Sequence, residues 1–118
     1  MSKEIVFVTS IDIDQGKHEE FKVLVKEMIA SSKKEPDTLS YDWFIDKSKT
    51  KCHGFERYTD SKAVVHHLNM FFEKYAKRMM ELCKTTDFSI YGDVNDEVRK
   101  MLKDANPQYY HHWQGFAS

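Results

Sequence analysis

Apolar and polar side chains alternate through the first segment of the chain, residues 4–13. Every second position is apolar or threonine: Ile5, Phe7, Thr9, Ile11 and Ile13. A period of two predicts a β-strand with one buried face. The intervening positions are also apolar near the start, at Val6 and Val8. We therefore expect both faces of this strand to be covered there.

The period changes to that of a helix between Gly16 and Lys34. One helical face collects the large apolar side chains Phe21, Leu24, Val25, Met28 and Ile29. This spacing predicts an amphipathic helix. Two glutamates lie in its first turn and two lysines in its last turn, and both placements suit the helix dipole. Pro36 prevents the helix from continuing.

The rest of the chain alternates between the same two periods. We expect strands over residues 39–46, 51–58 and 87–94. We expect three further helices: a short one over 61–69 capped by Thr59 or Asp60, a longer one with Phe72, Tyr75, Ala76, Met79 and Cys83 on one stripe, and a last one that Asn95 caps and Pro107 stops. The tail, Tyr109 to Phe116, is rich in aromatic side chains, so we expect it to pack on protein.

The order of these elements, β-α-β-β-α-α-β, predicts an α+β domain of ferredoxin-like type. Helices that follow the first and third strands can cover one face of a four-stranded antiparallel sheet. The other face still carries apolar and aromatic residues, and a large exposed apolar face usually marks an interface. We therefore expect a homodimer in which two sheets pair face to face, as a dimeric α+β barrel that encloses a cavity.

Composition narrows the class of protein further. The chain has 118 residues, of which 41% are hydrophobic, and its net charge of −1 comes from intermixed acidic and basic side chains. No basic stripe predicts a nucleic-acid partner, and no apolar stretch is long enough to predict a membrane partner. The N-terminal residues lack the apolar region of a signal peptide. Cys52 and Cys83 do not form a Cys-x-x-Cys motif, so we expect free thiols and a cytoplasmic location.

Residues 56–68 carry a spaced motif of acidic, aromatic, small, aliphatic and histidine side chains: Glu56, Tyr58, Asp60, Ala63, Val64, His67 and Leu68. This motif resembles the third-strand and second-helix signature of the antibiotic biosynthesis monooxygenase family. Residues 16–21 and 35–41 are similar to two upstream motifs of the family, with Asp37 where a glycine is usual. The resemblance implies a family domain over residues 1–94, followed by a C-terminal helix and aromatic tail over 95–118.

His67 is the first candidate for chemistry. A helical wheel places it on the inward side of its helix, whereas His66 falls toward solvent. An imidazole near neutral pKa can take a phenolic proton; alternatively, it can be a structural histidine bonded to a carboxylate or carbonyl. Glu56 could orient a histidine or pair with a base, and Arg57 points to the opposite face of the strand.

Aromatic side chains are the second set of candidates. They could line a cavity and stack on an aromatic substrate, or simply form core and interface: Tyr41, Trp43, Phe55, Phe72 and Tyr75. With Glu56 they make up the expected substrate-binding set. No metal site is expected, because adjacent histidines point apart and the usual ligand spacings are absent. No cofactor is expected either, because no glycine-rich phosphate loop is present.

The resemblance implies a cofactor-independent monooxygenase. Such an enzyme would oxidise a small electron-rich aromatic, a phenol or hydroquinone, with oxygen, and His67 would be the base. Three alternatives stay open: a haem-degrading relative, an isomerase and a non-catalytic small-molecule-binding barrel. The haem-degrading relatives carry an Asn on the first strand and a Trp on the second helix, and this sequence has neither.

Overall fold

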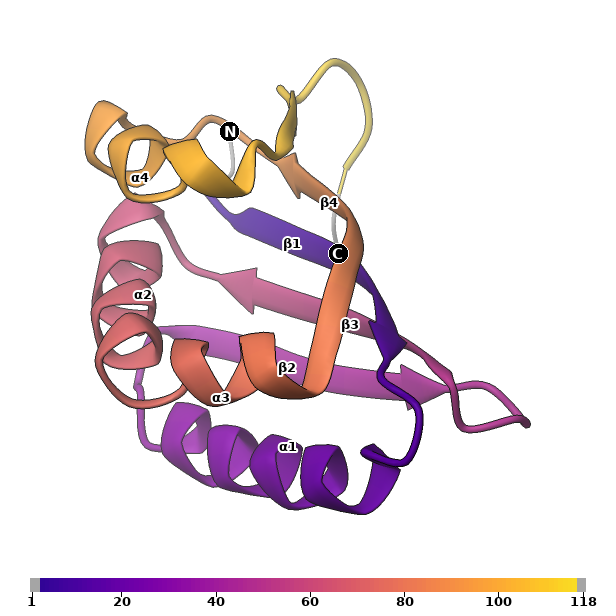
Figure 1. The fold of residues 1–118 in the computed structure, drawn as a ribbon. Helices are drawn as coiled ribbons and strands as arrows, with labels where there is room; N and C mark the ends of the chain where they lie inside the picture. Colours follow the sequence, from indigo (N-terminus) through magenta and orange to yellow (C-terminus); the bar gives the residue numbers. More distant parts are fainter. Residues whose placement is uncertain (1–2, 117–118) are drawn as a thin grey trace.

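Helices cover one face of a twisted β-sheet in the computed structural model, which describes residues 3–116 (Figure 1). The elements are, in chain order, β1 (Ile5–Ile13), α1 (His18–Lys33), β2 (Thr38–Ile45), β3 (Lys51–Tyr58), α2 (Ser61–Lys74), α3 (Ala76–Leu82), β4 (Cys83–Tyr91), α4 (Asp96–Met101), the 3-10 helix η1 (Lys103–Ala105) and β5 (Gln108–Tyr110). The expected α+β ferredoxin-like arrangement is confirmed.

In the described part of the chain the sheet has five strands in the order β2-β3-β1-β4-β5, and β5 pairs with β4 in parallel. The expectation of a four-stranded antiparallel sheet was therefore wrong. After η1 the chain turns at Asn106, whose φ is 47°, and lays Gln108–Tyr110 along the edge strand. A strand of three residues is too short to show an alternating pattern, so this segment was expected to be part of the aromatic tail and not a strand.

The boundary between α3 and β4 also differs from expectation. Cys83 is extended, with φ −160° and ψ 172°, and begins β4 instead of continuing the helical stripe. Two threonines follow it at 85 and 86, and β-branched side chains favour strands. The strand ends at Tyr91, because Gly92 adopts a φ of 110° that turns the chain. The strand expected over 87–94 thus lies four residues earlier at its start.

Side-chain caps explain where two helices begin. The Asp60 carboxylate accepts a hydrogen bond from the Ala63 N–H at 3.0 Å at the start of α2. The Asn95 side-chain oxygen accepts one from the Val98 N–H at 3.0 Å at the start of α4. Each cap satisfies an N–H that has no partner within its own helix. Of the residues described, no helix is long and apolar enough to cross a membrane.

The core between the sheet and the helices consists of two hydrophobic clusters. One gathers around α2 and α4 and includes Tyr58 and Leu68. The other gathers around α1 and α3 and includes Leu24 and Leu82. The cavity described below borders both clusters, so the interior of the domain is not one continuous packed core.

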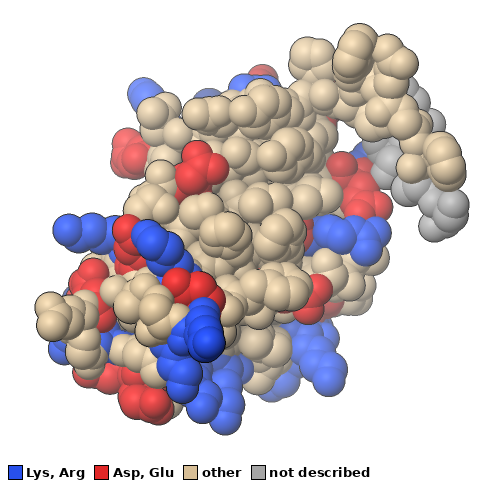
Figure 2. Space-filling model, turned by 90° about the vertical axis from the view of Figure 1, so that its right-hand side faces the viewer, with Lys and Arg blue, Asp and Glu red and all other residues tan. Residues whose placement is uncertain are grey.

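No helix among residues 3–116 covers the second face of the sheet. Phe55 is 39% exposed there and makes an edge-to-face contact with Phe44 at 5.5 Å, while Tyr91 stacks on Tyr110 at 5.2 Å. Figure 2 views the molecule from the side away from α2 and shows an uncharged area across the middle, with charged side chains along its margins. Within one chain, the expected covering of this face is not present.

The aromatic tail packs only in part. Tyr109 contacts the core cluster around α2 and receives the Arg99 guanidinium over its ring at 4.1 Å. Beyond β5 the side chains point to solvent: Trp113 is 83% exposed and Phe116 is 93% exposed. The segment arcs away from the sheet (Figure 1), so the expectation that the tail packs on protein holds for its first residues within one chain.

Candidate active site

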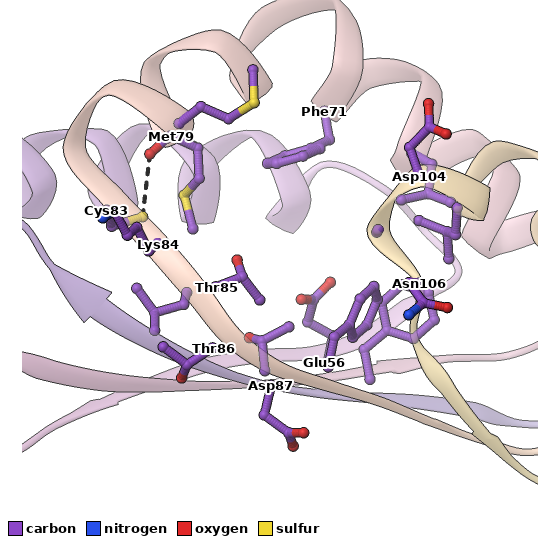
Figure 3. Close-up of a pocket in the computed structure, with 18 of the residues that line it drawn as sticks. Glu56, Phe71, Met79, Cys83, Lys84, Thr85, Thr86, Asp87, Asp104 and Asn106 are labelled. Atoms are coloured by element: carbon purple, nitrogen blue, oxygen red, sulfur yellow. Dashed lines mark hydrogen bonds between the residues drawn. The ribbon is translucent and has the colours of Figure 1, made fainter.

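A cavity of about 830 Å³ lies between the sheet and the helical layer of a single chain. The strands β1, β2 and β3 form its floor, α2 and α3 form its roof, and β4 and the segment after α4 close its sides (Figure 3). Its walls are largely apolar, with Phe7, Ile11, Leu68, Phe71, Met79 and Phe88 among them. The sequence had suggested a cavity between two paired sheets; this one lies on the helix-covered face.

Gly54 shapes the cavity floor. A Cβ at this position would lie 2.8 Å from Thr9 Oγ1 and 3.4 Å from the Trp43 ring, so only glycine leaves room for both side chains. Two polar atoms on this floor, Thr9 Oγ1 and Trp43 Nε1, are almost wholly covered by surrounding protein atoms and make no hydrogen bond to the residues that the structure describes. Buried polar groups are normally paired, so these two are exceptions within the floor.

A buried histidine stands at one end of the floor, between two carboxylates. His67 on α2 is only 3% exposed. Its Nδ1 lies 3.0 Å from Glu35 Oε1, and its Nε2 lies 3.5 Å from Glu56 Oε1. The three side chains come from α2, the loop between α1 and β2, and β3, respectively. Each ring nitrogen therefore faces its own carboxylate.

Glu35 is the carboxylate farther from the cavity. It follows the last turn of α1, where Pro36 prevents further helix, and its Oε1 accepts hydrogen bonds from the Thr38 hydroxyl at 2.7 Å and from His67. Burial by itself raises the pKa of Glu35, but the hydrogen bonds from His67 and Thr38 outweigh burial and hold that pKa below its usual range. Glu35 is therefore ionised at neutral pH.

Glu56 is the carboxylate that lines the cavity, and its side chain points from the sheet into it (Figure 3). It accepts a short hydrogen bond from the Tyr58 hydroxyl. Burial raises the pKa of Glu56, and the neighbouring His67 and Tyr58 offset only part of that rise. A carboxyl with a raised pKa in a dry site is suited to exchange a proton with a bound molecule.

Two tyrosines flank the same imidazole. The rings of Tyr41 and Tyr58 both lie 5.3 Å from the His67 ring. Burial, and then the negative charge of Glu56, raise the pKa of both phenols well above the ordinary value. Both are therefore neutral phenols, and Tyr58 acts here as a donor that holds Glu56 in place.

The structure brings together most of the residues proposed from sequence. Tyr41, Trp43, Glu56, His67 and Phe72 all line the cavity. Two do not. Phe55 lies on the uncovered face, because adjacent residues of a strand point to opposite sides and Glu56 points inward. Tyr75 lies at the break between α2 and α3, where its hydroxyl donates to the Glu27 carbonyl at 3.5 Å.

Several site residues were not found from sequence. Glu35 lies 32 positions from His67, and only the Glu-Pro pair after α1 marked it. Phe71 lies one helical turn after His67 on the same face, and this spacing was a usable signal. Further lining residues are those at 84–88 and, after α4, Leu102, Asp104, Ala105, Asn106 and Gln108. Their place in the cavity depends on where β4 begins and on the path of the chain after α4. Neither follows from the pattern of apolar and polar residues.

Neither the two cysteines nor a metal site adds a reactive group to the cavity within the described residues. Burial raises the pKa of Cys52 to about 11 and that of Cys83 to about 12, so neither is a thiolate near neutral pH. Across residues 3–116, no three His, Cys, Asp or Glu side chains are grouped so that they could hold a metal ion.

Comparison with known proteins gives the family. Residues 4–81 match the antibiotic biosynthesis monooxygenase family, and this chain belongs to that family. No curated protein matches the sequence. The match ends within α3, so the family assignment covers β1 to α3 and leaves out the last part of the cavity wall.

Solved structures share the fold at low sequence identity. MupZ from Pseudomonas fluorescens aligns with a TM-score of 0.89 at 23% identity, over 100% of this chain and 91% of MupZ. SnoaB from Streptomyces nogalater, a cofactor-independent oxygenase, aligns with a TM-score of 0.68 at 16% identity, over 80% of this chain and 96% of SnoaB. Rv0793 from Mycobacterium tuberculosis aligns with a TM-score of 0.68 at 17% identity, over 79% of this chain and 97% of Rv0793.

Proposed function

We propose that this protein is a cofactor-independent monooxygenase that oxidises a small electron-rich aromatic, a phenol or hydroquinone, inside the cavity. The observation that carries the proposal is the pairing of Glu56 with His67 at the edge of an apolar, aromatic-lined cavity. Membership of the monooxygenase family supports it, as does the shared fold of SnoaB, which works without a cofactor.

The reaction balances without an added reductant. Glu56 takes the proton of the substrate hydroxyl, and the resulting phenolate ring is electron-rich enough to reduce oxygen. A carbon–oxygen bond forms at a ring carbon, and Glu56 returns its proton to the outer peroxide oxygen. The ring carbon then loses its hydrogen as a proton, the oxygen–oxygen bond breaks, and this second proton joins the departing hydroxide. One oxygen atom stays in the product and the other leaves as water, so a phenol and oxygen give a quinone and water. All the electrons come from the substrate.

The residues of the cavity have distinct roles in this reaction. Glu56, which lies next to His67, accepts the substrate proton and later donates a proton to the departing oxygen. The Trp43 and Thr9 side chains lie on the cavity floor and shape the space in which the substrate is held. The apolar walls exclude water from the reactive intermediates, and the Phe72 ring contacts the substrate.

Oxygen uptake tests the proposal directly. A panel of phenols, hydroquinones and a dihydroxyanthrone is incubated with the purified protein in an oxygen electrode. We expect one oxygen consumed per quinone formed, with one labelled oxygen atom in the product when labelled gas is used. Glu56→Gln lowers kcat by about 10²-fold or more, because general acid–base catalysis contributes about 10²–10⁴-fold. Glu73→Gln, at an exposed position of α2, is the matched control. Equal values of kcat for Glu56→Gln and Glu73→Gln would show that Glu56 has no role in the reaction.

We also propose that two copies pair through the uncovered sheet face. Proteins of this family are commonly dimeric, and the exposed aromatic pairs on this face favour contact with a second apolar surface. A stable pair would bury more than about 1,200 Å² in total. Phe55→Glu places a charge in the middle of this face, and we expect it to convert the dimer to a monomer in light scattering. A wild-type monomer at micromolar concentration would contradict the pairing.

A further inference from the structure

We propose that Glu56, His67 and Glu35 form a proton relay that crosses the domain, from the cavity to a separate recess on the opposite side of His67. The relay rests on the proposed function only in that a substrate hydroxyl supplies the proton. The arrangement of Glu56, His67 and Glu35 does not depend on which molecule fills the cavity.

The middle of the relay is the imidazole. Its two nitrogens face two different carboxylates, at 3.0 Å for Nδ1 to Glu35 and 3.5 Å for Nε2 to Glu56. A histidine can accept a proton on one nitrogen while it releases the proton on the other. The Glu56 contact is longer than a hydrogen bond, so this step requires the two groups to approach when Glu56 becomes protonated and turns to donate.

The outer end of the relay is Glu35. It lines a second, smaller recess of about 220 Å³ formed by the loop before β2 and the first two turns of α2. The recess has no lining residue in common with the main cavity. Glu35 Oε2 is buried and accepts no hydrogen bond from the residues that the structure describes, so it has the capacity to take up a proton at the border of the recess.

The charged surroundings set the direction of transfer. Glu35 is ionised, so it holds the proton of Nδ1 and leaves the lone pair of Nε2 toward Glu56. The groups that face the imidazole are Tyr41 and Tyr58, both neutral phenols. Around Glu35 lie the Thr38 hydroxyl and, on the rim of the recess, Asp37, Lys62 and His66.

The proton inventory closes over one reaction. In the first half, the substrate proton passes to Glu56 and then to Nε2, while the Nδ1 proton passes to Glu35 and to water in the recess. In the second half each step runs in reverse, because the departing peroxide oxygen needs a proton to leave as water. The imidazole then returns to its first tautomer. The cavity can therefore exchange protons with solvent while the substrate seals it.

Glu35→Gln tests the relay, because it keeps the shape of the side chain and replaces the carboxylate that can take up a proton by an amide that cannot. Nitrogen NMR of histidine-labelled protein reports which ring nitrogen of His67 carries the proton. We expect Nδ1–H in the wild type and a larger share of Nε2–H in the variant, because a neutral amide oxygen holds the Nδ1 proton less strongly than a carboxylate. We also expect kcat to fall at least about tenfold, since proton transfer contributes about 10²–10⁴-fold, with KM within about twofold and a shifted acidic limb of the kcat–pH profile. Glu73→Gln is again the control.

The outcomes separate the relay from the oxygenase. An unchanged His67 tautomer in Glu35→Gln, or an unchanged pH profile, overturns the relay. A changed tautomer in a protein that consumes no oxygen with any phenol supports the relay and removes the oxygenase. If Glu35→Gln does not fold, Glu35→Asp keeps a carboxylate on the same loop; we expect it to keep the wild-type tautomer, and loss of that tautomer would count against Glu35 as the acceptor.

Discussion

Replacing His67 by alanine should expose the cost of leaving two carboxylates buried together. His67 and both carboxylates are almost fully buried, and the imidazole is the group that lies between them. Removing the group that compensates a buried charge costs about 3–5 kcal/mol, because the Glu35 carboxylate is left without its hydrogen-bond partner His67. For a domain of 118 residues, this free energy corresponds to a fall in Tm of roughly 10–25 °C.

The loss should depend on pH, and the sign follows from Glu35. In the wild type the pKa of Glu35 is lowered, so its stabilisation is present above its ordinary pKa and is lost as the pH falls through the lower folded value. Without His67, the hydrogen bonds to Glu35 no longer outweigh the effect of burial. The pKa of Glu35 therefore rises above its ordinary value. The variant then takes up a proton on folding, and its stability falls as the pH rises.

Urea unfolding followed by circular dichroism at about pH 4 and about pH 7 measures this difference. We expect the gap between wild type and His67→Ala to be wider at the higher pH. His66→Ala, at the exposed neighbouring position, should stay within about 0.5 kcal/mol of the wild type. Adding Glu56→Gln to His67→Ala should recover part of the loss, because a neutral amide replaces one unpaired carboxylate. A gap of equal size at both pH values would refute the reasoning.

Three further predictions concern the floor, the thiols and the tail. Gly54→Ala should cost about 1–3 kcal/mol of unfolding free energy through overpacking and should change Trp43 fluorescence; unchanged stability and fluorescence would place the Trp43 ring elsewhere. Cys52 and Cys83 should react slowly with a thiol reagent at mildly alkaline pH in the folded state and fully in urea, because burial raises the pKa of both; fast reaction without urea would contradict their burial. Truncation after Tyr110 should leave unfolding of the dilute chain nearly unchanged, since the side chains beyond it point to solvent, and should weaken self-association in light scattering if the tail contacts a second copy.

Local pattern was enough for much of the fold. The alternation over residues 51–58 gave both ends of β3, and the Asp60 and Asn95 caps gave the starts of α2 and α4. Helical period also placed His67 inward and His66 outward. These features depend on which face of an element is apolar and on hydrogen bonds within a few residues, and both are properties of the sequence itself.

The site was decided by tertiary structure. Glu35 and His67 meet because the loop after α1 packs against α2, and no periodicity links residues 32 positions apart. Phe55 and Glu56 were both expected to line the cavity, yet only one of two neighbouring strand residues can face the helices, and that residue is Glu56. The fifth strand and the cavity wall beside it required the chain to turn back after α4. A sequence pattern specifies which side chains avoid water, whereas the packing of distant elements specifies which of them meet.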